Sequence, residues 1–149
     1  MDGFEQRLAR LERFFPLTEG NAEAFLQEVA ALTASKDRRV VAPILLLADD
    51  HCRLAGIMDD MLSQLEEVSL AEYVDEFLEA LPAFYANSPR YARREIKKLL
   101  WTDAARPLLV VAARGLSREK AAALVRILSE ISEPSLAGAI GAVQSSLVD

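Results

Sequence analysis

Two neighbouring side chains, His51 and Cys52, are the only ones of their kinds in the sequence and could in principle form a nucleophile and its general base. In cysteine hydrolases the imidazole removes the proton from the thiol through a direct hydrogen bond. Adjacent residues on a helix point about 100° apart, which prevents that bond, and no third residue is placed to orient the histidine. One histidine and one cysteine also cannot supply the three or four ligands of a zinc site. We therefore expect neither catalysis nor zinc binding here.

Carboxylates are the other residues that could do chemistry, and ten of them lie between residues 49 and 79 against a single cation, Arg53. They are Asp49, Asp50, Asp59, Asp60, Glu66, Glu67, Glu72, Asp75, Glu76 and Glu79. Adjacent acids diverge on a helix, so they do not form an acid–base pair, and no EF-hand spacing, Glu-x-x-His motif or glycine-rich phosphate loop is present. The sequence predicts no catalytic residue, no metal site and no cofactor.

The same acids alternate with Leu, Ile, Met and Phe at helical spacing, which is typical of folded helices with acidic outer faces. Ordinary surface helices mix both signs of charge, whereas this region is nearly devoid of cations. A solvated face with no partner is the competing interpretation. We expect a basic partner to bind Asp49, Asp50, Asp59, Asp60, Glu66, Glu72, Asp75, Glu76 and Glu79.

Length and composition indicate one globular domain over residues 1–149. The chain has 52% hydrophobic and 27% charged residues, which is normal for proteins that fold around a core. Cys52 is the only cysteine, and the start of the chain lacks a charged and apolar leader pattern, so we expect a cytoplasmic protein. The longest apolar run, residues 40–48, is about half the ~20 residues that cross a bilayer, so we expect no membrane segment.

Charge is distributed unevenly along the chain. The net charge is −6, but residues 1–86 carry −10 and residues 87–149 carry +4. A pI near 4.9 argues against direct nucleic-acid binding. The basic residues concentrate in 89–100 as Arg90, Arg93, Arg94, Lys97 and Lys98, interrupted only by Glu95. This basic face either neutralises the acidic helix before it within the fold, which we favour, or forms a second binding face.

The periodicity predicts an all-α fold, because apolar residues recur three and four apart and no segment alternates like a strand. We expect about nine short antiparallel helices, in an irregular stack of HEAT-like αα-hairpins. Their expected ranges are about 2–14, 21–34, 37–47, 49–66, 69–84, 88–100, 102–110, 117–131 and 134–147. Ser69 and Glu72 predict a capping box, and Ser88 followed by Pro89 predicts a helix start. Pro82 should kink its helix or end it early.

Four segments carry a likeness to a known family. They are Asp37 with residues 40–50, residues 55–66, residues 78–82 with 88–92 and 96–100, and residues 117–131. The third is the closest, with a leucine–proline pair followed by serine–proline and then tyrosine–alanine. On these residues the chain resembles the immunity protein 30 family of bacterial polymorphic toxin systems.

That resemblance implies a small cytoplasmic antidote that inactivates a cognate protein toxin by tight, stoichiometric binding, without catalysis. Many toxin domains attack nucleic acids through basic active sites, so a basic nuclease domain is the partner we expect for an acidic helical face. The alternative is a helical-repeat adaptor or scaffold protein that self-associates, for example as a homodimer, through its oppositely charged halves.

Overall fold

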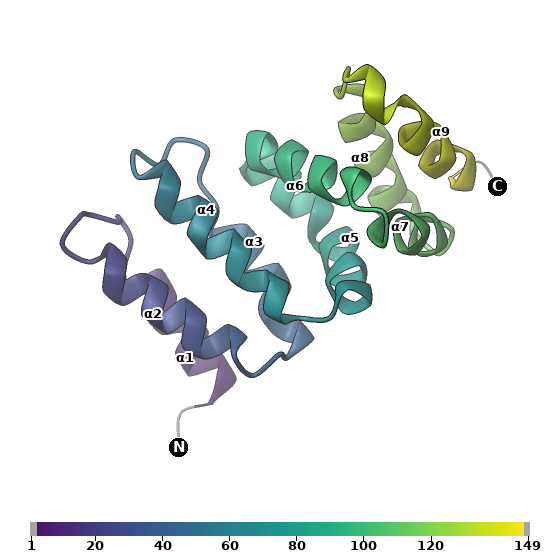
Figure 1. The fold of residues 1–149 in the computed structure, drawn as a ribbon. Helices are drawn as coiled ribbons and strands as arrows, with labels where there is room; N and C mark the ends of the chain where they lie inside the picture. The colour runs from purple at the N-terminus through teal and green to yellow at the C-terminus, as the bar shows by residue number, and fades with distance from the viewer. Residues whose placement is uncertain (1–2, 148–149) are drawn as a thin grey trace.

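The computed structural model describes residues 3–147, in which nine α-helices and three short 3-10 helices follow one another without a β-strand (Figure 1). The α-helices are α1 (Phe4–Glu12), α2 (Ala22–Thr33), α3 (Val41–Leu47), α4 (Ala55–Ser63), α5 (Leu70–Asn87), α6 (Pro89–Trp101), α7 (Ala105–Ala113), α8 (Arg118–Ser129) and α9 (Ala137–Ser146). The 3-10 helices are η1 (Arg38–Val40), η2 (Gln64–Glu67) and η3 (Pro134–Leu136). The all-α prediction is confirmed. Asp2, at which the first helix was expected to begin, lies outside the described residues.

Local signals place several helix starts correctly. Ser69 accepts a hydrogen bond from the backbone N–H of Glu72 at 3.3 Å, and its hydroxyl donates to the Glu72 carboxylate at 2.9 Å. Ser117 caps α8 in the same way, with a hydrogen bond from the N–H of Lys120. These side chains satisfy donors that the first turn of a helix otherwise leaves unpaired.

The structure corrects two expectations about where helices begin and end. Asp49 and Asp50 do not begin a helix, because the chain forms a loop there and α4 starts only at Ala55. Of the two outcomes predicted for Pro82, an early helix end does not occur, since α5 continues to Asn87, and a kink stays a prediction. Burial of α5 on several neighbours offsets the lost backbone hydrogen bond at the proline.

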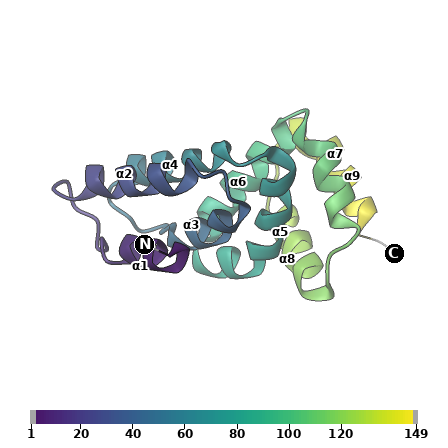
Figure 2. The ribbon, with the colours of Figure 1, turned by 90° about the horizontal axis from the view of Figure 1, so that it is seen from below.

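Helix α5 is the central element of the fold. It contacts α3, α6, α7 and α8, while α2 packs against α4 and α7 against α9. Figures 1 and 2 show the helices following one another from α1 at one end of an elongated molecule to α9 at the other. Each helix therefore has mostly near neighbours in the chain; the HEAT-like stacking of hairpins stays a prediction.

One continuous hydrophobic cluster runs through the molecule. Phe77 and Phe84 from α5 are fully buried, and their rings meet edge to face with centroids 6.1 Å apart. Phe25 from α2 is equally buried and receives the edges of Phe14 and Phe15. Within residues 3–147, no helix is long and apolar enough to span a membrane.

Candidate protein-binding surface

Asp50 is a structural carboxylate rather than a free surface charge. Its two oxygens accept hydrogen bonds from the backbone N–H groups of Arg90 at 2.8 Å and Tyr91 at 3.1 Å. Ser88, at the predicted cap position, does not cap α6 but donates its hydroxyl proton to the backbone carbonyl of Ala48. The loop after α3 therefore caps α6, and a carboxylate at this position also stabilises the positive end of the helix dipole.

Three of the acids on α5 share one arginine. The Arg38 guanidinium on η1 lies 2.8 Å from Glu76, 3.5 Å from Asp75 and 3.8 Å from Glu72. The hydrogen bond from Arg38 to Glu76 is the main reason that the pKa of this guanidinium is raised above its ordinary value. Arg38 thereby offsets the mutual repulsion of acids that lie one turn apart.

Two further acids pair with cations from the second half of the chain. Asp59 on α4 forms an ion pair with Arg94 on α6, and Glu79 on α5 forms one with Lys120 on α8. These contacts join segments 35 and 41 residues apart.

Three cations on the basic face of α6, Arg93, Arg94 and Lys97, form ion pairs within the fold, but not with the helix that we predicted. Besides Arg94, Arg93 pairs with Glu130 at 3.4 Å and Lys97 with Glu133 at 2.7 Å. The expectation that this face neutralises α5 is wrong for the described residues, because its ion pairs reach α4 and the α8–η3 region. The lysine hydrogen bond is the main cause that lowers the pKa of Glu133.

Of the ten acids between residues 49 and 79, all of which the structure describes, three have side chains without a hydrogen bond or ion pair. They are Asp60 in the second half of α4 and Glu66 and Glu67 on η2, all exposed. Asp49 is also exposed, but its carboxylate accepts the N–H of His51 at 2.9 Å in a tight turn. Within this acidic stretch the unpaired charge therefore lies on α4 and η2, and we call Asp60, Glu66 and Glu67 the free acidic cluster.

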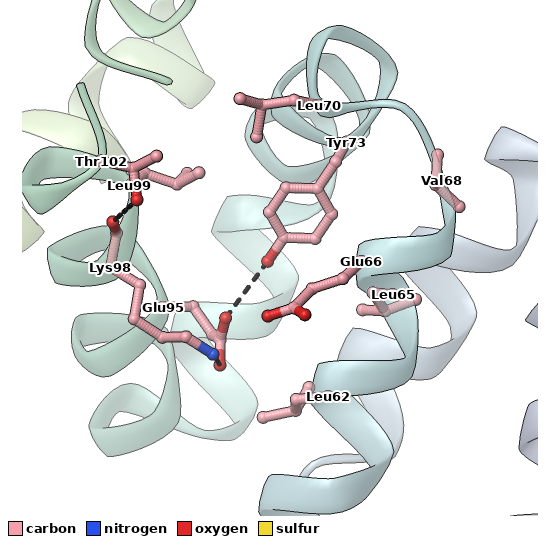
Figure 3. A pocket seen from close by; sticks show the side chains of 10 residues that line it. All are labelled: Leu62, Leu65, Glu66, Val68, Leu70, Tyr73, Glu95, Lys98, Leu99 and Thr102. Atoms are coloured by element: carbon pink, nitrogen blue, oxygen red, sulfur yellow. Dashed lines mark hydrogen bonds and ion pairs between the residues drawn. The ribbon is translucent and has the colours of Figure 1, made fainter. Parts of the chain in front are cut away.

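A pocket of about 270 Å³ opens beside this cluster, between η2, the start of α5 and the last turns of α6 (Figure 3). Its walls are mostly apolar and are formed by Leu62, Leu65, Val68, Leu70, Tyr73 and Leu99, with Glu66, Glu95, Lys98 and Thr102 as the other lining residues. Figure 3 shows the Glu66 carboxylate pointing from one wall towards the Glu95 carboxylate on the other. Two carboxylates and one ammonium group therefore face a largely apolar space.

Glu95 is the least exposed charged residue of this region, with a side chain only 6% exposed. The Tyr73 hydroxyl donates to one of its oxygens at 3.3 Å, and the Lys98 ammonium donates to the other at 3.2 Å. Burial, followed by the nearby Glu95 charge, raises the pKa of Tyr73 well above its ordinary value. Tyr73 therefore stays a neutral donor to Glu95.

Glu95 and Tyr73 were missing from the predicted site. In the sequence, Glu95 stands out only as an interruption of the basic residues in 89–100. A signal was present, since Glu95 lies three residues after Ala92 and four before Leu99, both buried, which places it on the inward face of α6.

His51 and Cys52 have no hydrogen bond between their side chains among the described residues. His51 is exposed and Cys52 is half-buried, in a loop before α4. Among residues 3–147, no group of three or more His, Cys, Asp or Glu side chains is arranged to hold a metal ion. The free acidic cluster and the largely apolar pocket beside it are suited to recognising another molecule.

One protein-family model, described as immunity protein 30, matches residues 14–109 of this chain, which is more than half of its 149 residues. The match covers the first three of the four segments that carried the resemblance and also extends to residues before Asp37, whereas residues 117–131 lie outside it. No curated protein and no solved structure matches the chain. The free acidic cluster and the whole pocket lie within the matched range.

Proposed function

Because the chain belongs to the immunity protein 30 family, we propose that it neutralises a cognate protein toxin by binding it in a stoichiometric complex. The family match is the observation that carries this proposal. The protein acts as an inhibitor without catalysis, and it meets its toxin in the cytoplasm.

The free acidic cluster is the part of the acidic stretch best suited to contact the toxin. Asp60, Glu66 and Glu67 have no intramolecular partner, so binding need not break an existing ion pair. The acids around Arg38, by contrast, would lose a cation already within 4 Å. We therefore narrow the nine predicted contact residues to Asp60 and Glu66 and add Glu67.

A basic toxin, such as a nuclease domain, is the partner that this charge favours. Opposite charges on two proteins steer their diffusional encounter and increase the association rate, and salt screens the effect. Affinity itself depends more on buried anchors that fill pockets. The pocket beside the cluster supplies such a position on this chain.

The alternative, self-association through oppositely charged halves, has weaker support. The two halves already pair with each other inside one molecule, through Asp59 with Arg94 and Glu79 with Lys120. Because these charges are already paired within one molecule, fewer of them remain to attract a second copy. Electrostatic attraction would therefore stabilise a homodimer only weakly.

Co-expression with the toxin encoded beside this chain tests the proposal. Cells that make the toxin alone should stop growing, whereas cells that make both proteins should grow and yield a one-to-one complex on gel filtration. As a matched control, a core variant such as Phe77→Asp should fail to protect because it does not fold. Growth arrest despite abundant folded wild-type protein would contradict the proposal.

A further inference from the structure

We propose that the pocket between η2, α5 and α6 binds an arginine side chain of the partner, with Glu66 and Glu95 contacting its guanidinium group. This inference rests on the proposed function and specifies the chemistry of the contact. Of the residues that line this pocket, only Glu66 is among the nine predicted contact residues.

The size of the pocket favours one side chain over a small-molecule substrate. Its volume of about 270 Å³ lies below the roughly 300–1,000 Å³ typical of ligand and cofactor sites. A single large side chain from a protein partner is the kind of anchor that occupies such a space at the centre of an interface.

The walls fit the two parts of an arginine. Leu62, Leu65 and Leu99 line the pocket and can pack against the aliphatic stem of the incoming side chain. Arginine keeps its charge in such surroundings and presents five N–H donors in a planar fork that matches carboxylates. A purely apolar side chain would leave Glu66 desolvated without a partner, which costs free energy.

The acceptors for those donors are available. A carboxylate offers about four lone-pair sites, and Glu95 uses one on each oxygen, for Tyr73 and for Lys98. The Glu66 carboxylate accepts no hydrogen bond from another described residue, so all of its lone-pair sites are available. With Lys98 included, the charged groups that line the pocket sum to −1, which favours a cation.

Lys98 competes with the arginine for Glu95. Its side chain is 44% exposed, and it also lines the neighbouring groove on α6 together with Trp101. Lys98 can therefore turn towards that groove when another cation enters. Removing its charge should strengthen binding, an effect that a purely structural role of the pocket does not produce.

The test measures the affinity of the purified chain for the toxin by isothermal titration calorimetry, with matched pairs of variants. Glu66→Gln is compared with Glu67→Gln, since both acids are exposed, unpaired and on η2. Lys98→Met is compared with Lys97→Met, because both remove one positive charge from α6. Urea unfolding of each variant verifies that the fold is retained.

We expect Glu66→Gln to weaken binding about tenfold or more, and Glu67→Gln by about threefold or less, since a hydrogen bond to a charged group is stronger than a distant charge. Lys98→Met should bind more tightly than Lys97→Met. Changing one arginine of the toxin to glutamine should weaken binding at least as much as Glu66→Gln does, and adding Glu66→Gln to that toxin variant should cause no further loss.

Two results overturn the inference in distinguishable ways. If the wild-type chain does not bind the toxin, the proposed function is wrong, and so is the assignment of a toxin arginine to the pocket. If the wild type binds but Glu66→Gln equals Glu67→Gln, or no toxin arginine is coupled to Glu66, the pocket assignment fails while the proposed function stands.

Discussion

Asp50 provides the sharpest stability prediction, because the structure gives this surface carboxylate a structural role. Its oxygens accept the N–H groups of Arg90 and Tyr91 from 40 and 41 residues away. Changing Asp50→Ala leaves both donors without this acceptor and removes the negative charge at the start of α6. Nearby, Ser88 still holds the carbonyl of Ala48, so the loop should stay close to the helix.

The expected loss is the sum of two known effects. Removing a capping side chain costs about 0.5–2 kcal/mol, and removing a charge that complements the helix dipole costs about 0.3–1 kcal/mol. Asp50→Ala should therefore lower the free energy of unfolding by about 1–3 kcal/mol. Asp50→Asn keeps one amide oxygen as an acceptor but loses the charge, so its loss should be smaller.

Urea unfolding, followed by circular dichroism, measures this loss directly. Asp49→Ala is the matched control, since Asp49 carries the same charge one residue away but accepts only the N–H of His51. That control should change stability by less than about 0.5 kcal/mol. Equal unfolding midpoints for Asp50→Ala and Asp49→Ala would refute the capping role of Asp50.

Three further predictions concern the core and the tyrosines. Phe77 is fully buried against Phe84, so Phe77→Ala should lower the free energy of unfolding by about 3–5 kcal/mol; a loss below about 1 kcal/mol in urea unfolding would contradict the packing. The hydrogen bond from Tyr85 is the main cause that lowers the pKa of Glu130. A carboxylate whose pKa is lowered in the folded state stabilises the fold fully at pH values above its unfolded-state pKa, which is about 4.3 for a glutamate. This stabilisation is lost as the pH falls through the lowered pKa. Tyr85→Phe should therefore make stability fall less steeply on acidification, and identical acid unfolding curves would contradict this. The pKa values of all three tyrosines are raised, chiefly by burial for Tyr73 and Tyr91 and by the Glu130 hydrogen bond for Tyr85. The midpoint of their ultraviolet titration should therefore lie at a higher pH in the folded protein than in urea, where it should be about 10; a midpoint that does not fall on unfolding would contradict the structure.

The helices were predictable because their signals are local. Caps such as Ser69 and Ser117 lie within three residues of the donors that they satisfy, and apolar spacing identifies the buried faces. Pro82 shows the limit of local rules, since the burial of α5 on four neighbours decides the outcome there. The loop at Asp50 shows the same limit, because its partners lie on a helix far along the chain.

The acidic surface was predictable as a composition but not as a set of free charges. Counting acids requires only the sequence, whereas their partners lie at distant positions, such as Arg38 for Glu76, 38 residues away. Long-range pairing follows from how the helices pack, which no local pattern of charges specifies. The pocket was missed for the same reason, since η2, α5 and α6 form it together.

We propose that the toxin contacts the free acidic cluster rather than the paired acids of α5. Two triple variants that remove the same charge test it: Asp60→Asn with Glu66→Gln and Glu67→Gln, against Asp75→Asn with Glu76→Gln and Glu79→Gln. The measurement is the toxin Kd of each at low and high salt. The first triple should weaken binding by about tenfold or more and reduce its salt dependence, while the second stays within about threefold of wild type. The opposite order, or equal losses from both triples, would contradict the claim.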